Sequence, residues 1–547
     1  MIYRIADNIL SPLGVTTEQN YQAVMSGRSA LECYGDRSQL DGLTRFESLV
    51  VRSVRQALES VSFDIAGKNV AFILSTTKAN VEYLGREDVD RAILYPGESA
   101  QRIAEVLGLT TVPIVVCNAC VSGLSAIILA TRLLEARQYD YAIVCGADVL
   151  GPFVVSGFQS LKAVSPVPCK PFDIDRQGLN LGEAAATIVL GTESGGWTIQ
   201  AGAVRNDAYD ITAPSRNGEG AFRALQAVLQ GADTDELALL NAHGVASMFM
   251  DQMESVAIQR AGLTGIPVNS LKGYFGHTLG AAGVLETILT MRSLEAGTII
   301  GTKGFEELGV SGQIQVSAHQ RATDKRSFIK MLSGFGGCNA ALLVSDHGDG
   351  SADQSLRERD QQNRPHDHRV VITPTSVTVD GEQVTCQATG QQLLTELYKR
   401  YVGDYPRFYK MDMLSRLGFI ASELLIQQER QERFVPTEQR AVILFNHSSS
   451  IHADKAYLTS ISNPNDYYPS PALFVYTLPN IVTGEIAIRN HYHGETSFYI
   501  LPQCDKTVIS QVQQAAMRDA MTRSMMTGWL DCEDETHFEA DLCILSV

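Results

Sequence analysis

The chain has 547 residues, 45% of them hydrophobic, and a formal net charge of −17. Its length predicts two or more domains with large cores, and its acidity argues against a nucleic-acid-binding protein, which needs a basic surface. No stretch approaches the roughly 20 apolar residues of a membrane span, and residues 1–14 lack the features of a signal peptide. Because the ten cysteines show no disulfide or metal-site spacing, we expect a reduced, cytoplasmic protein that binds no metal.

Strand-like and helical runs alternate along about the first 345 residues, a pattern typical of α/β layers. The expected elements are, in chain order, a helix over 45–60, strands over 70–74 and 114–117, a helix over 124–134, and strands over 141–145 and 184–190. Residues 346–368 are poor in hydrophobic side chains and predict a flexible linker. From residue 369 the pattern resumes with a hairpin around Asp380-Gly381. These features divide the chain into segments 1–345, 346–368 and 369–547.

Cys120 follows the β-rich run 112–116 and precedes the expected buried helix. The positive end of a helix favours a thiolate at such a position. Lowering a thiol pKa from about 8.5 to about 7 requires roughly 2 kcal/mol, more than the ~0.3–1 kcal/mol that a helix terminus usually supplies. A nearby histidine is therefore expected to contribute. Taken alone, the cysteine fits an inert core position better than a reactive one.

Further motifs follow Cys120 along the chain. They are the run 170–184 with Lys170-Pro171-Phe172-Asp173, the segment Asn241-Ala242-His243-Gly244, the segment Lys272 to His277 with Glu286 nine residues later, and the turn Gly334-Phe335-Gly336-Gly337. Together with Ala119-Cys120-x-Ser122-Gly123, they resemble the β-ketoacyl-acyl carrier protein synthases of the thiolase-like superfamily. Each motif is weak alone, and five in this order are specific. The resemblance covers about residues 1–345 and implies a five-layered αβαβα fold.

The resemblance implies a decarboxylative condensation between an acyl thioester and a malonyl thioester, as in fatty-acid, polyene or polyketide-type synthesis. Cys120 would accept the acyl group, and neutral imidazoles of His243 and His277 would donate hydrogen bonds to the enolate. Lys272 and Glu286 would form an ion pair that orients the rings. No cofactor is implied beyond the 4′-phosphopantetheine arm that an acyl carrier protein brings.

The glycine-flanked Phe335 resembles the family's mobile gate, and its backbone N–H with that of Cys120 would hold the thioester oxyanion, next to Gly336. Phe275 and Ser247 are expected to contact the pantetheine arm. Here the chain departs from the family, because Val245 stands where a hydroxyl is usual. This loss puts binding of the arm at this wall in doubt.

Acyl carrier proteins, the partners implied by the resemblance, are acidic, so docking to this acidic chain requires a local basic patch. Lys162, Lys170 and Arg176 lie near the motifs in sequence and are candidates; scattered solvated charges would look the same.

Residues 369–547 resemble a diverged copy of the first segment's front half. A helical stretch at 413–428 and a strand at 440–448 correspond in character to 45–60 and 69–77, residues 493–500 to the strand before Cys120, and 527–531 to 139–143. Either Gln503 or Cys504 would occupy the nucleophile's place, and no counterpart of the histidine motifs follows. The segment is expected to act as a second, partial thiolase-like lobe that pairs with the first, in place of or beside homodimerisation.

Other functions remain open at this point. The protein could be a condensing enzyme of a pigment or polyene pathway, a degradative thiolase, or a non-catalytic carrier-protein scaffold resembling a chain-length factor. Intact Cys120, His243, Lys272 and His277 argue against a scaffold, and the second cysteine usual in a thiolase is not evident.

Overall fold

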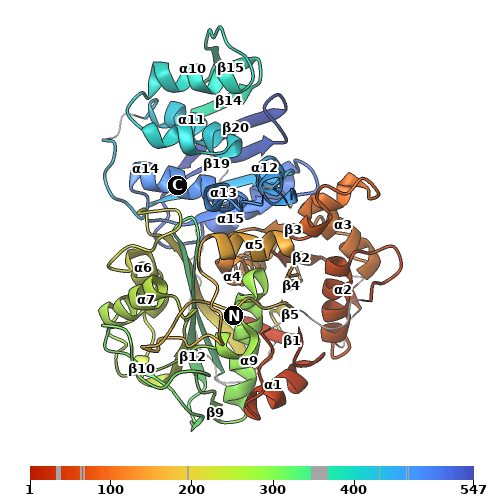
Figure 1. Cartoon of the computed structure of the whole chain (residues 1–547), viewed down its shortest axis with the longest axis vertical. Helices are drawn as coiled ribbons and strands as arrows, with labels where there is room; N and C mark the ends of the chain where they lie inside the picture. Colours follow the sequence, from red (N-terminus) through yellow and green to blue (C-terminus); the bar gives the residue numbers. More distant parts are fainter. Residues whose placement is uncertain are drawn as a thin grey trace.

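The computed structural model describes residues 1–31, 38–61, 64–65, 68–193, 196–346, 368–429, 432–463, 465 and 467–546. Figure 1 shows the segment up to residue 346 below and the segment from residue 368, coloured cyan to blue, packed on top of it. Most of the predicted linker, residues 347–367, lies outside the described residues. No helix in these described ranges has the length and apolarity needed to cross a membrane.

The first sheet contains the strands predicted from the sequence. Its order is β3-β2-β4-β5-β1, with β3, β2 and β4 mutually parallel and β5 antiparallel to both β4 and β1. The bounds are β1 Ile2–Leu10, β2 Val70–Ser75, β3 Ile114–Val116, β4 Tyr141–Asp148 and β5 Ala184–Gly191. Strands β2 to β5 are buried along their whole length, which explains why they read as continuous apolar runs.

A second sheet repeats this order. Strand β8 is parallel to β7 and β7 to β12, while β13 runs antiparallel to β12 and to β6. The bounds are β6 Trp197–Asn206, β7 Leu237–Asn241, β8 Pro267–Asn269, β12 Ser327–Gly334 and β13 Cys338–Asp346, with β10 Gln315–Val316 beside β8. Strands β9 Thr298–Ile299 and β11 Arg321–Ala322 form a separate pair.

The C-terminal segment repeats the order a third time. Strands β18 and β19 flank β17 in parallel, and β20 runs antiparallel to β19 and β14. The bounds are β14 His368–Thr373, β15 Ser376–Val379, β16 Glu382–Gln383, β17 Arg440–Asn446, β18 Thr496–Ile500, β19 Ser524–Cys532 and β20 Phe538–Ser546. Strand β18 begins three residues later than expected, because the backbone N–H of His493 donates to Thr437 instead of joining the ladder. The predicted hairpin is confirmed, with Asp380 and Gly381 both at positive φ between β15 and β16.

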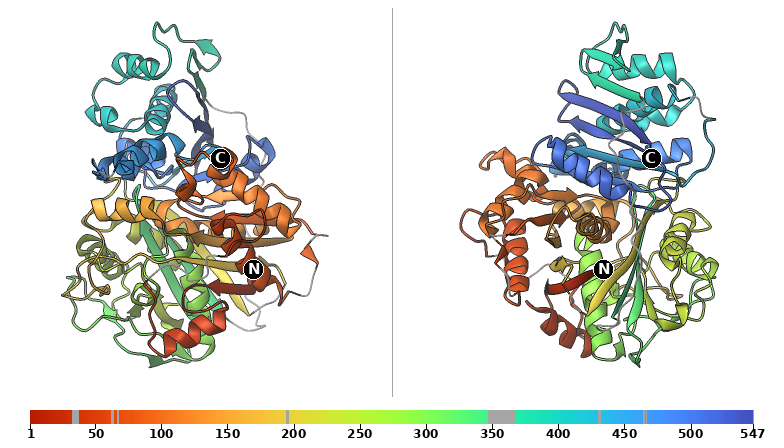
Figure 2. Two further views of the ribbon diagram at one scale, coloured as in Figure 1. Left: turned by 45° about the vertical axis from the view of Figure 1, so that its right-hand side comes forward. Right: turned by 180° about the vertical axis from the view of Figure 1, so that it is seen from behind.

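Helices separate and cover the sheets. Helices α4 and α9 pack against each other between the first two sheets, α2 covers β1, β4 and β5 outside, and α6 covers β6 and β13 on the opposite side, an arrangement visible in Figures 1 and 2. This confirms the predicted five-layered αβαβα fold. The helices are α1 Thr17–Met25, α2 Arg45–Leu58, α3 Pro96–Leu107, α4 Ser122–Glu135, α5 Pro152–Ser160, α6 Glu219–Leu229, α7 Met248–Arg260, α8 Lys272–Phe275, α9 Ala282–Glu295, α10 Gln391–Tyr401, α11 Met413–Ile426, α12 Ile451–Ser462, α13 Pro471–Tyr476, α14 Ile481–Asn490 and α15 Lys506–Ala516.

The C-terminal segment continues the first sheet through its β3 edge. Strand β18 pairs antiparallel with β3, with Tyr499 opposite Val116. Asn118 accepts a hydrogen bond from the Phe498 N–H at 2.8 Å and donates to the Ser497 hydroxyl at 3.1 Å. The strand that leads to Cys120 is therefore held by residues nearly 400 positions later in the chain.

Buried ion pairs reinforce this junction. Arg132 of α4 contacts Glu495 at 2.7 Å, and Arg205 of β6 contacts Asp519 at 2.9 Å.

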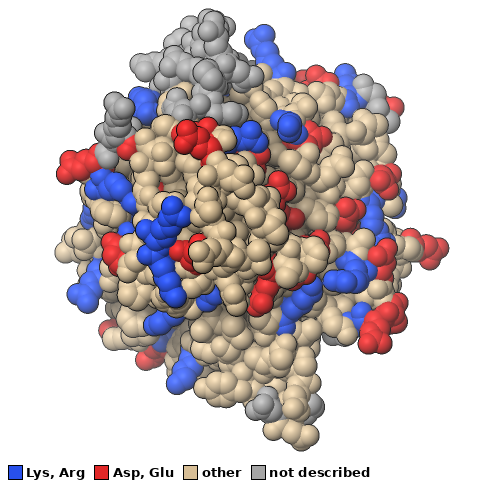
Figure 3. All heavy atoms as spheres, turned by 90° about the horizontal axis from the view of Figure 1, so that it is seen from above, with Lys and Arg blue, Asp and Glu red and all other residues tan. Residues whose placement is uncertain are grey.

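On the face shown in Figure 3, basic and acidic side chains are interspersed, so charge of one sign does not gather there.

Candidate active site

Cys120 lies in a short 3-10 turn, Ala119–Val121, between β3 and α4. Ala119 adopts a φ of 48°, a strained conformation for a residue with a Cβ. The Ser122 hydroxyl stabilises the turn, since it accepts from the Asn118 N–H at 2.9 Å and donates to the Ala119 carbonyl at 2.6 Å. The turn presents the half-buried Cys120 side chain to a cavity.

The thiol of Cys120 is protonated in this environment. Burial raises its pKa to about 12, and the opposing effect of the Lys272 charge is smaller. The expectation that the helix terminus and a histidine favour the thiolate is therefore wrong. The physical reason is that desolvation of a thiolate costs more than a helix terminus returns.

His243 and His277 lie on two loops that meet at the cavity. The backbone N–H groups of His243 and Gly244 donate to the two carboxylate oxygens of Glu254 at 2.5 and 2.8 Å. His277 is anchored through its own N–H to the Asn180 carbonyl at 2.7 Å. The two imidazole rings stand edge to face, with their centroids 5.2 Å apart.

Both imidazoles are neutral. Burial, followed by the nearby lysine charges, lowers the pKa of each histidine well below its ordinary value. Both ring nitrogens of His277 and Nδ1 of His243 are buried and have no hydrogen-bond partner in the described parts of the chain. A neutral imidazole with a free N–H can donate to an oxygen that develops negative charge.

Glu286 binds two lysines. Lys272 Nζ lies 2.5 Å from one carboxylate oxygen and Lys330 Nζ lies 2.6 Å from the other, and all three side chains are buried. The Lys272–Glu286 contact matches the expected ion pair. Sequence analysis missed Lys330; the signal was a lysine inside the otherwise apolar strand Phe328-Ile329-Lys330-Met331-Leu332, where an unpaired charge is not tolerated.

The Phe335 loop joins β12 to β13 beside Cys120. Gly336 and Gly337 adopt φ values of 84° and 71°, which a residue with a Cβ rarely adopts. Gly334 lies against the turn that holds Cys120, since a Cβ on Gly334 would come within 3.1 Å of the Cys120 nitrogen. The Phe335 ring stacks on Phe158 with centroids 6.4 Å apart.

The C-terminal segment also contacts this loop. Asn480 donates from Nδ2 to the Phe335 carbonyl at 2.9 Å. A Cβ on Gly484 would lie 2.6 Å from the Gly336 carbonyl oxygen. Helix α14 therefore restricts where the Phe335 loop can move.

A cavity of about 440 Å³ joins these groups. Its walls include Cys120, His243, His277, Phe335 and Ser247. A second cavity of about 20 Å³ also borders Phe335. Its walls are Cys120, Phe335, Thr77, Lys78, Ala119, Val154, Phe158, Leu279, and Phe474 and Leu478 from the C-terminal segment. The smaller cavity is thus built from both segments.

Of the two residues expected to contact the pantetheine arm, one lines the larger cavity and the other does not. Ser247 lines the larger cavity, but its hydroxyl accepts from the Met250 N–H at 3.1 Å and so caps α7. Phe275 is buried in the core and is not among the cavity-lining residues.

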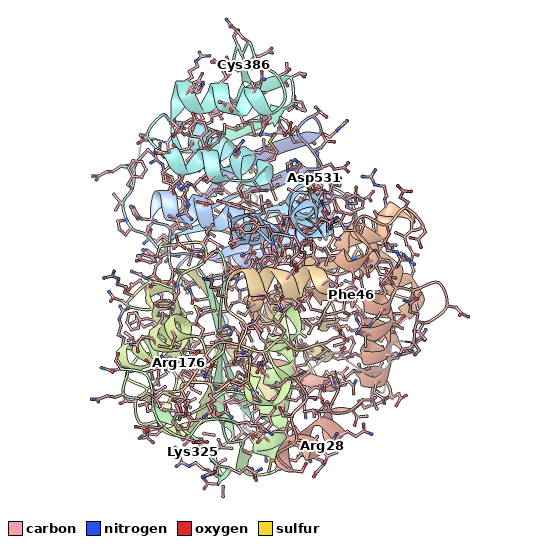
Figure 4. All side chains as sticks on the ribbon, viewed as in Figure 1. Arg28, Phe46, Arg176, Lys325, Cys386 and Asp531 are labelled. Carbon is pink, nitrogen blue, oxygen red and sulfur yellow. The ribbon has the colours of Figure 1, made fainter. Side chains whose placement is uncertain are left out.

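Arg176 is not a surface cation. It is buried, and Nη1 donates to the carbonyls of Asp173 and Gly309 at 2.8 and 2.7 Å; its place among the yellow and green elements is labelled in Figure 4. Its proposed docking role is therefore wrong, because a guanidinium that binds backbone carbonyls is not free to contact a partner. Lys162 is exposed at the cavity wall, and Lys170 lies 3.9 Å from Asp175.

Of the two residues considered for the second nucleophile position, Cys504 has the same spacing to its flanking strand and helix as Cys120. Cys120 lies four residues after the end of β3 and two before α4, and Cys504 lies four residues after β18 and two before α15. Its side chain is exposed, unlike that of Cys120.

Comparisons with known proteins agree with this geometry. The chain matches the β-ketoacyl synthase N-terminal domain over residues 17–195 and the C-terminal domain over residues 197–306. It is 30% identical to a putative mitochondrial 3-oxoacyl-[acyl-carrier-protein] synthase of Schizosaccharomyces pombe over 44% of this chain and 63% of that protein. It is 26% identical to 3-oxoacyl-[acyl-carrier-protein] synthase 2 of Vibrio cholerae over 61% of this chain and 96% of that protein.

Two solved structures extend the comparison. A ketosynthase in complex with its chain length factor from Xenorhabdus doucetiae is similar over 63% of this chain and 98% of that chain, with 26% identity and a TM-score of 0.54. The PfaC keto synthase-chain length factor structure is similar over 100% of this chain and 78% of that chain, with 16% identity and a TM-score of 0.74. At this identity the second likeness establishes the fold alone, and it includes the C-terminal segment.

Proposed function

Because the chain belongs to the β-ketoacyl synthase family, we propose that it condenses an acyl thioester on Cys120 with a malonyl thioester and releases carbon dioxide and a 3-oxoacyl thioester. The observation that carries the proposal is the convergence of Cys120 with two neutral, buried imidazoles on one cavity. A carrier protein supplies both substrates on its 4′-phosphopantetheine arm.

In the first half-reaction, the Cys120 sulfur attacks the acyl carbonyl, and the pantetheine thiol leaves with the proton that Cys120 gives up. Because burial keeps the thiol protonated, the proton must leave as the bond forms; a neutral imidazole nitrogen is the base available in the cavity. The tetrahedral oxyanion lies between the backbone N–H groups of Cys120 and Phe335.

In the second half-reaction, the malonyl carboxylate leaves as carbon dioxide, and its bonding electrons form an enolate. Imidazole N–H groups of His243 and His277 donate to the enolate oxygen. The enolate carbon attacks the acyl-Cys120 carbonyl, and the Cys120 thiolate is displaced and takes up a proton. Lys272 and Glu286 act behind the rings and fix the local charge.

Mass spectrometry tests this proposal. After incubation with an acyl-carrier substrate, the peptide that contains Cys120 should carry the acyl mass. A Cys120→Gln variant should lose condensation and retain malonyl decarboxylation, while Cys504→Ala, at the equivalent position of the C-terminal segment, should behave as wild type. If Cys120→Gln still condenses, Cys120 is not the nucleophile.

We further propose that residues 369–547 form a degenerate synthase-like lobe that serves as the intrachain partner of residues 1–345. Three contacts support this role: β18 covers the β3 edge, Asn480 binds the Phe335 loop, and Phe474 walls the cavity beside Cys120. Because the two lobes share one chain, their pairing has a high effective concentration.

Specific activity should therefore not fall on dilution. A loss of activity at nanomolar concentration, in step with dissociation measured by mass photometry, would show that a separate partner chain is needed.

The cytoplasmic location remains a prediction.

A further inference from the structure

Lys330 is a buried cation that the reaction steps above do not use. It lies in the middle of β12, opposite Asn241 of the parallel neighbour β7, and its side chain has no solvent exposure. Nζ donates to Glu286 at 2.6 Å, to the Ala242 carbonyl at 3.1 Å and to the Asn241 carbonyl at 3.4 Å. The lysine therefore connects the glutamate behind the imidazoles to the two residues that immediately precede His243.

The second lysine changes the charge of the cluster. Lys272 and Glu286 alone would be neutral as an ion pair. Together with Lys330 they carry one positive charge below the pKa of Lys330, which burial lowers to about 8. Burial alone would raise the pKa of Glu286, but the two lysines outweigh burial and hold it below its ordinary value.

The other titratable groups around the imidazoles are already bound to backbone amides or lie at the nucleophile. Glu254 accepts hydrogen bonds from the His243 and Gly244 N–H groups, and Asp251 accepts from the Val245 and Phe172 N–H groups. Asp148 accepts from the Gly280 and Thr77 N–H groups. Cys120 is a neutral thiol. Among the described residues, Glu286 forms ion pairs with Lys272 and Lys330. Lys272 balances the charge of Glu286, so Lys330 is the source of the remaining positive charge.

We propose that Lys330 is a positioning residue for the condensation: it fixes Glu286 and the end of β7 before His243, and its charge adds to burial in disfavouring a proton on either imidazole. The proposal rests on the function proposed above. The direction of the histidine pKa shifts agrees with it, because burial comes first and the charges of Lys272 and Lys330 lower both pKa values further. The same charge favours an enolate over its neutral precursor.

The test replaces Lys330 with methionine, which has a similar length and no charge, and with arginine, which keeps the charge. Protein labelled with [13C]histidine is titrated by NMR, with the His243 and His277 signals assigned from single variants. In Lys330→Met the pKa of at least one of these histidines should rise by about one unit. In Lys330→Arg the titration should stay near that of the wild type.

The pH profile gives a second readout. Protonated imidazole cannot donate and accept as the reaction requires, so the acid limb of kcat in Lys330→Met should move to higher pH. The displacement of the acid limb, in pH units, should equal the rise in histidine pKa that the NMR titration measures. A purely structural role would lower kcat at every pH and leave the limb and the NMR titration in place, and that result would overturn the proposal.

The NMR readout does not depend on condensation. If Cys120→Gln shows that the proposed reaction is wrong, the histidine titrations in Lys330→Met still decide whether Lys330 sets their charge. If Lys330→Met does not fold, as judged by circular dichroism, Lys330→Gln and Lys330→Arg are compared in its place. Equal histidine pKa values in the Gln and Arg variants would contradict the proposal.

Discussion

Replacing Gly484 with alanine tests whether the C-terminal segment controls the Phe335 loop. Gly484 lies inside α14, and an added Cβ would approach the Gly336 carbonyl oxygen to 2.6 Å and its Cα to 2.9 Å. Helix propensity alone predicts that alanine stabilises the protein by about 1 kcal/mol. Overpacking against backbone costs about 1–3 kcal/mol, so the net change should be a loss of about 0–2 kcal/mol in the free energy of unfolding.

The loss of activity should exceed the loss of stability. The Phe335 loop borders both cavities and supplies a backbone donor in the proposed mechanism, so its displacement should lower kcat by at least tenfold, about 1.4 kcal/mol in the transition state. Stability is measured by urea unfolding and activity by condensation under saturating substrates.

Gly418→Ala is the matched control for this experiment. A Cβ there would meet the side chains of Leu530 and of Val482, which also lies in α14, so this variant presses on the same helix without touching Gly336. It should lower stability and leave kcat within twofold. If Gly484→Ala folds and keeps full kcat, or if both variants lose activity equally, the contact between α14 and the loop does not control the site.

Three further predictions follow from the site and its walls. The rate of Cys120 alkylation by iodoacetamide should rise about tenfold per pH unit from pH 8 to 10, because burial raises the thiol pKa to about 12, and a plateau near pH 8 would contradict this; exposed Cys504 serves as the internal reference. Phe474→Ala should enlarge the cavity of about 20 Å³ and lower the free energy of unfolding by about 3–5 kcal/mol. It should also shift the acyl preference to longer chains, as measured by mass spectrometry of the acylated enzyme. An unchanged preference would exclude Phe474 as a wall of the acyl site. Arg176→Ala should lower the unfolding midpoint because buried carbonyls lose their donor, whereas Lys162→Ala should weaken carrier binding without changing the midpoint; equal effects of the two variants would refute the distinction.

Local sequence patterns predicted several strands and helices of residues 1–345. Apolar runs correctly predicted β2 to β5 because these strands are buried on both faces and need no polar alternation. The bulk of α4 was also predicted, but the 3-10 turn that holds Cys120 was not, because a φ of 48° at Ala119 leaves no pattern in the sequence.

Electrostatic expectations failed where they depended on burial. The sequence places Cys120 near a helix start, but burial of the thiol decides its pKa. That burial depends on long-range packing, such as β12 against the turn Ala119–Val121. Arg176 failed as a docking cation for the same reason: neighbours distant in sequence, such as Gly309, bury its guanidinium.

The sequence by itself made Cys120, His243 and His277 candidate site residues through their resemblance to family motifs, and it predicted the α/β layers, since periodicity is a local property of the chain. Only the tertiary structure decided that Lys330 shares Glu286 with Lys272, that Asn480 binds the Phe335 loop, and that Cys504 takes the position of Cys120 without its surroundings. Those relations arise from strand pairing over long separations, between β12 and β7 and between β18 and β3. Pairing depends on which edges and faces are buried together, and no single stretch of sequence contains that information.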